Sequence, residues 1–163
     1  MNRALPDSIQ VRHISKVDDD FHARFSAKKR IYRYLITSKQ ITPFNEKYIT
    51  KVDIINEDII KEAINCFVGV YDFEFFHKRG SDKENLVREI FEASFYKYKD
   101  VYVFKFIANS YLRSQIRLMV GFLLEISKGK LTIEDLKKQL NKEKFVFKIP
   151  ALPNGLYLAK IIY

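Results

Sequence analysis

Basic and aromatic side chains crowd one short segment, residues 21–34, which contains no acid. The segment carries five fixed positive charges, those of Arg24, Lys28, Lys29, Arg30 and Arg33, and four aromatic rings, those of Phe21, Phe25, Tyr32 and Tyr34. Arginine and lysine neutralise phosphates, and flat rings on an extended segment stack with unpaired bases. The segment therefore predicts a surface that contacts RNA.

Arg117 is the second residue of chemical interest, because it interrupts an otherwise apolar helical pattern in residues 107–121. On a helix, Ser110, Arg113, Arg117 and Gly121 would share one face, and the glycine would leave room beside the guanidinium. The apolar stripe of that helix would consist of Leu112, Ile116, Met119 and Leu123. From the pattern alone, Arg117 lies at the edge of this stripe with its charge toward solvent, and Tyr32 is an ordinary core-facing aromatic of a strand.

Composition places the chain among globular proteins that meet a polyanion. Its 163 residues are 47% hydrophobic and carry 29 basic against 20 acidic side chains, a net charge of +9. This balance favours nucleic acid as a partner, although a generally lysine-rich surface would produce the same total. The single cysteine excludes an internal disulfide, and the three scattered histidines predict no metal site. No signal peptide or membrane span is predicted, so we expect a cytoplasmic protein.

Hydrophobic periodicity predicts a single α+β domain over residues 1–163. Strands are expected over 29–37, over 87–96 and 101–108 as a hairpin, and over 156–163; helices are expected from the cap Asn56 to Gly69, over 111–127, and from Thr132 onward. This β-α-β-β-α-β order is typical of a ferredoxin-like split β-α-β domain, in which helices cover one face of an antiparallel sheet. The other face would be open, and sheets of this kind often bind single-stranded RNA.

Four stretches spread along the chain carry recognisable motifs. Residues 20–34 read Asp-Phe-His-Ala-Arg-Phe-Ser-Ala and then Arg-Ile-Tyr-Arg-Tyr, and residues 69–76 fit the pattern G-x-x-D-F-x-x-F. Residues 109–121 fit N-x-[FY]-[LV]-x-x-x-[IV]-R-x-[IM]-V-G, and the last stretch is Gly155-Leu-Tyr-Leu158. Together they resemble the C-terminal part of the tRNA pseudouridine synthase A family, across nearly the whole chain. The resemblance implies one half of the pseudouridine synthase fold.

The resemblance also implies a reaction. Members of this family are isomerases that convert uridine to pseudouridine in the tRNA anticodon stem-loop, without a cofactor or metal, as homodimers. Their catalytic aspartate lies in a G-R-T-D-x-G-V-H-A motif that precedes the matched region and does not occur in this chain. Arg79-Gly-Ser-Asp82 imitates only part of that motif, and we interpret Asp82 as a solvated loop acid. We therefore expect a piece of a longer protein that is catalytically inactive by itself.

By the same resemblance, supporting roles fall on residues that are present. Tyr32 would stack on the uracil after the base leaves the helical stack, and Arg117 would pair with the absent aspartate in a bidentate manner. The tRNA would contact two segments, one consisting of Phe21, His22, Ala23, Arg24 and Phe25, and the other of Lys78, Arg79, Gly80 and Ser81. Two alternatives stay open: His22 as a buried histidine hydrogen-bonded near a turn, and residues 78–81 as a solvated surface loop.

A different class of function also fits the sequence, namely a free-standing, non-catalytic RNA-binding module of the same split β-α-β type. Ile31 and Ser114-Gln115 depart from the more polar or basic residues common in the family, which bears on the RNA contacts. The matches at Tyr32 and Arg117 are not affected by these departures.

Overall fold

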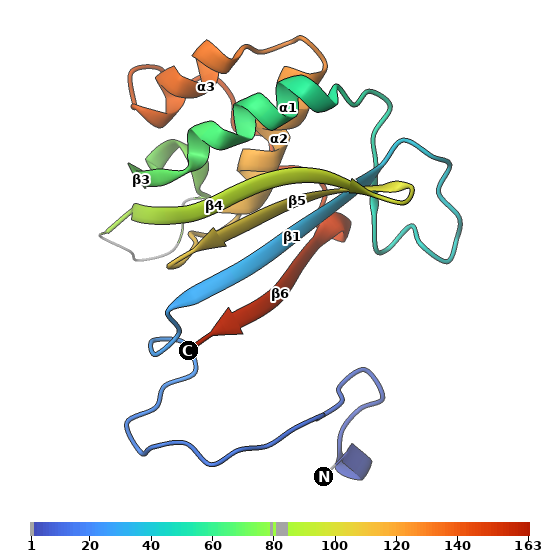
Figure 1. Ribbon diagram of the computed structural model, residues 1–163, viewed down its shortest axis with the longest axis vertical. Coiled ribbons are helices and arrows are strands. Elements are labelled where there is room, and N and C mark those ends of the chain that lie inside the picture. Colours follow the sequence, from blue (N-terminus) through green and yellow to red (C-terminus); the bar gives the residue numbers. More distant parts are fainter. Residues whose placement is uncertain (1, 79, 81–84) are drawn as a thin grey trace.

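A six-stranded sheet forms the centre of the molecule. The computed structural model describes residues 2–78, 80 and 85–163 (Figure 1). The strands are β1 (Lys29–Thr37), β2 (Thr50–Lys51), β3 (Gly69–Asp72), β4 (Val87–Tyr98), β5 (Val101–Ala108) and β6 (Leu156–Ile162). The helices are α1 (Glu57–Ile64), α2 (Gln115–Ser127) and α3 (Ile133–Leu140). Short 3-10 helices span Asn2–Ala4, Asn65–Phe67, Glu74–Phe76 and Pro153–Gly155.

The strand order confirms the expected split β-α-β domain. The order is β2-β1-β5-β4-β3, and β6 pairs with β1, so β6, β1, β5 and β4 are neighbours in that sequence. All pairings except the short parallel one between β1 and β2 are antiparallel. The bounds predicted for the two hairpin strands, 87–96 and 101–108, nearly match those of β4 and β5. The prediction of an α+β fold with helices on an antiparallel sheet is therefore confirmed.

The helices cover one face of this sheet, and the core lies between the two layers (Figure 1). Alternate residues of each strand face the helices, because side chains of a strand point to opposite faces. On β1 these include Tyr34 and Ile36, which are fully buried, as are Phe104 and Phe106 on β5. Phe67 and Phe76 pack edge to face in the same core at a centroid distance of 5.5 Å.

Two helix boundaries and two short strands differ from the sequence prediction. Helix α2 begins at Gln115 rather than at Tyr111, because Ser114 adopts a left-handed conformation with φ of 62°. Helix α1 ends at Ile64, and the expected end residue Gly69 instead opens β3 with φ of 129°. Strands β2 and β3 were not predicted, since two and four residues are too short to show a periodic pattern.

Residues 5–28 contain no strand or helix and run below β6 in the view of Figure 1 before they enter β1. The turn just before β1 contacts the end of β6: Lys28 donates its backbone N–H to the carbonyl of Ile162 at 2.8 Å. Within the described ranges, no helix has the length and apolar character needed to span a bilayer. Nor do the described His, Cys, Asp and Glu side chains form a group that could hold a metal ion.

Candidate nucleic-acid interface

Tyr32 lies two residues before Tyr34 on β1, and therefore on the same, helix-covered face of the sheet. In the sheet it is paired with Phe106 of β5 and Leu158 of β6. Its ring is partly buried and meets the ring of Tyr111 edge-on, with centroids 5.2 Å apart. The residue predicted to stack on uracil is therefore not on the open face, where sheet-binding RNA would be expected.

Tyr111 has a hydroxyl oxygen that is buried without a hydrogen-bond partner among the described residues. Burial raises the pKa of this phenol far above its usual value, and the neighbouring Tyr32 raises it further. Tyr111 precedes the helix, so it reaches Tyr32 from the turn that connects β5 to α2. The turn thereby supports the ring of Tyr32 from the side.

Arg117 is the third residue of α2, and its side chain is held by the backbone of the segment 149–152. Its Nε donates to the carbonyl of Ala151 at 2.7 Å, and the N–H of Ala151 donates to the carbonyl of Arg117 at 2.8 Å. This reciprocal pair fixes the guanidinium beside the segment. The expectation that Gly121 leaves room for the guanidinium is wrong, because a Cβ at Gly121 would overlap the carbonyl oxygen of Ile149. The glycine admits the segment that holds Arg117.

The same segment also holds β1. The hydroxyl of Tyr34 donates to the carbonyl of Leu152 at 2.6 Å and lies 2.8 Å from the hydroxyl of Thr50. Burial raises the pKa of Tyr34, while the hydrogen bond to Thr50 and the positive charge of Arg117 lower it. Arg117 is thus within electrostatic reach of the strand that carries Tyr32. Segment 149–152 thus bonds both to Arg117 and to Tyr34, which lies two residues after Tyr32 on β1.

The helical face proposed for Ser110, Arg113, Arg117 and Gly121 does not exist, because the first two residues precede the helix. Gln115 is fully buried and its Oε1 accepts the backbone N–H of Leu112 at 2.8 Å, which closes the turn instead. Arg113 is exposed on this turn. The turn replaces the first helical turn that the apolar pattern suggested.

The segment Phe21–Phe25 forms a compact turn at the end of β6. The ring nitrogen Nδ1 of His22 accepts the backbone N–H groups of Arg24 and Phe25 at 3.1 and 3.3 Å. His22 is exposed, so the alternative of a buried histidine is wrong, although its bonding within a turn is right. The backbone carbonyl of Ala23 accepts the hydroxyl of Tyr163 at 3.1 Å. The turn presents Phe25, 76% exposed, with the guanidinium of Arg24 5.6 Å from the centre of its ring.

The second predicted segment reaches the same end of the molecule. The N–H of Lys78 donates to the carbonyl of Arg113 at 3.0 Å. A Cβ placed on Gly80 would be 3.4 Å from the guanidinium of Arg113. Residues 78 and 80 therefore border the turn before α2. Arg79 and Ser81, together with the loop acid Asp82, lie outside the described residues.

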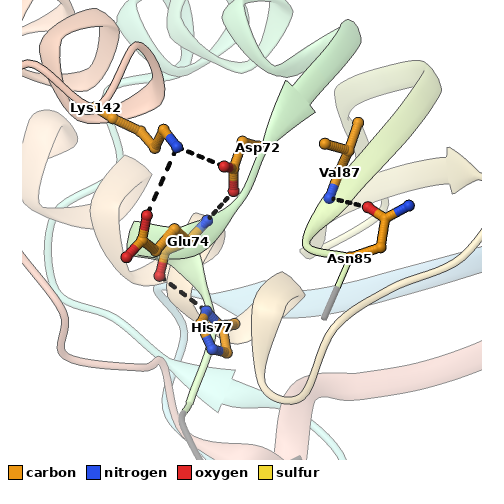
Figure 2. A network of polar contacts seen from close by, with 6 residues as sticks. All are labelled: Asp72, Glu74, His77, Asn85, Val87 and Lys142. Atoms are coloured by element: carbon orange, nitrogen blue, oxygen red, sulfur yellow. Dashed lines mark hydrogen bonds and ion pairs between the residues drawn. The ribbon is translucent and has the colours of Figure 1, made fainter. Parts of the chain in front are cut away.

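The loop containing Lys78 starts from a polar network, shown in Figure 2. Lys142 contacts the carboxylates of Asp72 at 2.5 Å and Glu74 at 3.6 Å, and the Asp72 pairing raises the pKa of Lys142. Asp72 also accepts the backbone N–H of Glu74 at 3.0 Å, and Nδ1 of His77 donates to the carbonyl of Glu74 at 2.8 Å. The aspartate of the D-F-x-x-F motif is thus used to join β3 to the end of α3.

A groove joins the Phe21–Phe25 turn to the sheet. Its lining residues are Arg24, Phe25, Ala27, Arg30, Asn85, Arg88, Asn109 and Ser110. Sequence reasoning assigned Arg24 and Phe25 a role and noticed the charge of Arg30, but it missed Arg88. The available signal was an arginine at a position where β4 alternates toward the core, which the hairpin prediction already implied.

Comparison with known proteins identifies relatives of this chain. Residues 63–163 match the family model described as tRNA pseudouridine synthase. Over all 163 residues, the chain is 40% identical to the tRNA pseudouridine synthase A of Campylobacter jejuni (strain RM1221), covering 68% of that protein. Identity is 39% with the protein of the same name from Helicobacter hepaticus and 37% with that from Wolinella succinogenes, covering 66% and 64% of them.

The split β-α-β sheet, with Tyr32 and Arg117 in their motif positions, and these matches define the class: the chain belongs to the tRNA pseudouridine synthase family. Within that family, the relatives named above all carry the name tRNA pseudouridine synthase A. The chain spans about two thirds of their length.

Proposed function

We propose that this chain is the RNA-contacting, C-terminal part of an isomerase that converts uridine to pseudouridine in the anticodon stem-loop of tRNA. The observation that carries the proposal is the 40% identity to a tRNA pseudouridine synthase A across every residue of the chain. The concentration of cationic side chains around the start of β1 supports a tRNA partner. The absence of a G-R-T-D-x-G-V-H-A segment from the sequence supports inactivity of the chain alone.

In the proposed reaction, the bond from ribose to the base nitrogen breaks, the base turns, and a bond from ribose to a base carbon forms. Tyr32 stacks on the extruded uracil and limits its movement, because its ring is supported edge-on by Tyr111. Arg117 holds the incoming catalytic carboxylate ionised and fixed in direction, and its own Nε is already anchored on Ala151. The remaining guanidinium nitrogens are the ones that would meet the carboxylate.

The finer parts of the proposal concern assembly and location. The intact protein acts as a homodimer in the cytoplasm, needs no cofactor or metal, and does not associate with a membrane. The family resemblance supports each of these statements. Phe21–Phe25 and the loop of residues 78–81 contact the tRNA backbone, and the exposure of Phe25 and Arg24 supports the first of these two contacts.

Substitution in the intact protein tests the two residue roles. Tyr32→Leu and Arg117→Ala should each reduce pseudouridine formation to background while most of the tRNA affinity remains. Lys130→Ala is the matched control, because Lys130 lies beyond the far end of α2 and its side chain is 68% exposed. Turnover by both site variants at the rate of the control would refute the assignments.

Incubation of this chain alone with uridine-containing tRNA tests the missing carboxylate. At equimolar enzyme and tRNA, no pseudouridine should form in a single turnover. Product from the chain alone would contradict the proposed division of the site. Reading the coding sequence around the chain separates the enzyme from a free-standing RNA-binding module, since only the enzyme requires an in-frame G-R-T-D-x-G-V-H-A segment.

A further inference from the structure

Arg88 is an unusual charge, because it is buried and has no carboxylate partner among the described residues. It is the second residue of β4, faces the helix side of the sheet opposite Tyr71, and is only 7% exposed. Buried guanidinium groups are normally paired with an acid. Burial lowers the pKa of Arg88.

Within the described residues, the hydrogen bonds of Arg88 are made to backbone carbonyls and not to a carboxylate. Its Nη1 donates to the carbonyls of Asn85 at 3.0 Å and Val87 at 2.5 Å, and its Nε has no partner within the described part of the chain. The side chain of Asn85 in turn accepts the N–H of Val87 at 2.8 Å, which fixes the start of β4 (Figure 2). Neutral carbonyl groups of the described chain therefore hold the guanidinium in position.

Arg30 shows the same arrangement on the other side of β5. Its Nη1 donates to the carbonyls of Asn109 at 2.5 Å and Ala27 at 3.3 Å, and its Nη2 donates to the carbonyl of Arg24. Arg30 and Ile90 are both paired with Ala108, so Arg30 and Arg88 lie on one face of the sheet at the same end. In the portion of the chain that the structure covers, every ion pair uses a lysine, and none uses an arginine.

The groove between these two residues has the properties of an anion site. Its volume is about 490 Å³, and the described residues that line it include three arginines and no acid. Phe25 adds an exposed aromatic face at its edge, beside Arg24. Planar guanidinium groups suit the oxygens of a phosphate, and an adjacent free ring suits a base of the same strand. Together these features favour an RNA strand over an acidic peptide.

We propose that Arg30 and Arg88 form a phosphate-binding site for the RNA backbone at the start of β1. Arg30 lies two residues before Tyr32 on this strand. Phe25 stacks on a neighbouring base of the bound RNA. The site rests on the proposed function in one respect, that the strand it receives belongs to the tRNA substrate. Arg88 acts from a fixed position, because its carbonyl bonds hold it before the RNA arrives.

The test is tRNA binding by the chain at several salt concentrations. Arg88→Met keeps most of the side-chain volume and removes the charge. We expect it to weaken binding about tenfold at low salt, and to reduce the slope of log affinity against log salt by about 0.7 to 0.9, the contribution of one phosphate contact. Lys130→Met removes one charge at a remote, exposed position and should change affinity less than twofold.

A second measurement needs no substitution and covers the case in which Arg88→Met does not fold. The Nε–H resonances of Arg88 and Arg30 in the unsubstituted chain should shift when anticodon stem-loop RNA is added. Unshifted resonances under saturating RNA, or a folded Arg88→Met chain with the affinity and salt slope of the unsubstituted chain, would overturn the site. If the unsubstituted chain does not bind tRNA at all, the proposed function fails, which is a separate outcome. Binding of an acidic peptide but not RNA in the groove would likewise refute the phosphate assignment.

Discussion

Two tyrosines near the candidate site differ sharply in what their hydroxyl groups contact. Tyr34 is fully buried, and its hydroxyl bonds to the carbonyl of Leu152 and to Thr50. The hydroxyl of Tyr111 is also buried but has no partner in the described ranges. A buried polar group without a partner destabilises the folded state, whereas a bonded one stabilises it slightly.

Removal of each hydroxyl should therefore have opposite consequences. Tyr34→Phe should lower the free energy of unfolding by about 1 to 2 kcal/mol, since it also leaves the Leu152 carbonyl without its donor. Tyr111→Phe should leave the free energy of unfolding unchanged or raise it by up to about 1 kcal/mol, and it keeps the ring that supports Tyr32. Urea unfolding of both variants measures the difference, and equal losses in the two would contradict it.

At the level of single residues, the sequence motifs were sufficient to choose Tyr32 and Arg117 but not to describe their surroundings. The face on which Tyr32 lies followed from strand alternation, whereas its contact with Tyr111 depends on a turn whose left-handed Ser114 has no sequence signature. Arg88 was missed for a similar reason. Strand alternation indicates that Arg88 faces inward, but only the assembled sheet reveals that it has no acid partner among the described residues.

The segment 149–152 and helix α2 depend on each other through Gly121. A glycine in the middle of a helix is normally unfavourable by about 1 kcal/mol relative to alanine. Here the space above Gly121 is filled by the carbonyl of Ile149, and the N–H of Ala151 lies close by. The close approach allows two hydrogen bonds between Arg117 and the backbone of Ala151, one from the side-chain Nε of Arg117 and one to its carbonyl.

Gly121→Ala should thus destabilise the fold despite the better helix propensity of alanine. Displacing the segment from a well-packed position should lower the free energy of unfolding by about 1 to 3 kcal/mol, and should reduce turnover in the intact protein because Arg117 loses its anchor. Denaturant unfolding checks the first effect. A neutral or stabilising result would mean that the segment moves away without loss.

Helix α3 is stabilised at its start by a capping box between Thr132 and Asp135. The hydroxyl of Thr132 accepts the N–H of Asp135 at 3.1 Å, and the carboxylate of Asp135 accepts the hydroxyl of Thr132 at 2.7 Å and its N–H at 3.0 Å. The bond from the Thr132 hydroxyl, followed by that from its N–H, lowers the pKa of Asp135.

A depressed carboxyl pKa means that the carboxylate stabilises the fold above the ordinary aspartate pKa of about 3.9, and that this stabilisation is lost as pH falls through the lower folded value. Thr132→Ala should cost about 1 kcal/mol at pH 7. Its cost should become smaller toward pH 2, as Asp135 in the unsubstituted chain takes up its proton. Urea unfolding at both pH values measures this difference, and a cost that is independent of pH would exclude the carboxylate from the cap.

Helices and strands with a strong local sequence signal could be predicted, whereas strands that form only through pairing with a neighbour could not. The caps Asn56 and Thr132 marked the starts of α1 and α3 correctly, and the alternation of β1 marked both ends of that strand. The start of α2 was wrong, because its apolar pattern continues through a turn that is not helical. β2 exists only through two pairs with β1, which no local pattern can indicate.

For the molecule as a whole, the two faces of the sheet have different surfaces. The helix-covered side ends in the arginine-lined groove, whereas the open face carries a largely apolar hollow. Residues lining this hollow include Leu35, Tyr96, Tyr98, Val103, Tyr157 and Leu158, with Arg33 as the single cation. The total charge of +9 could be read from the sequence, but its uneven distribution required the strand order.

This distribution predicts binding that is dominated by phosphate contacts. Affinity of the chain for tRNA should fall by at least about tenfold between 50 and 200 mM monovalent salt, because each neutralised phosphate releases a counterion. Fluorescence anisotropy with labelled tRNA measures it, with an equally sized neutral polymer as the control for non-specific association. A flat salt dependence would argue against both the enzyme and the RNA-binding module.

Tyr163 connects the carboxyl end of the chain to the Phe21–Phe25 turn, through its packing on Phe21 at a centroid distance of 4.9 Å and its hydroxyl bond to Ala23. A fluorophore or any segment attached directly after Tyr163 would therefore lie close to the turn that we propose contacts RNA. Binding assays on this chain are best made with labels at other positions, such as the exposed Lys130 beyond α2.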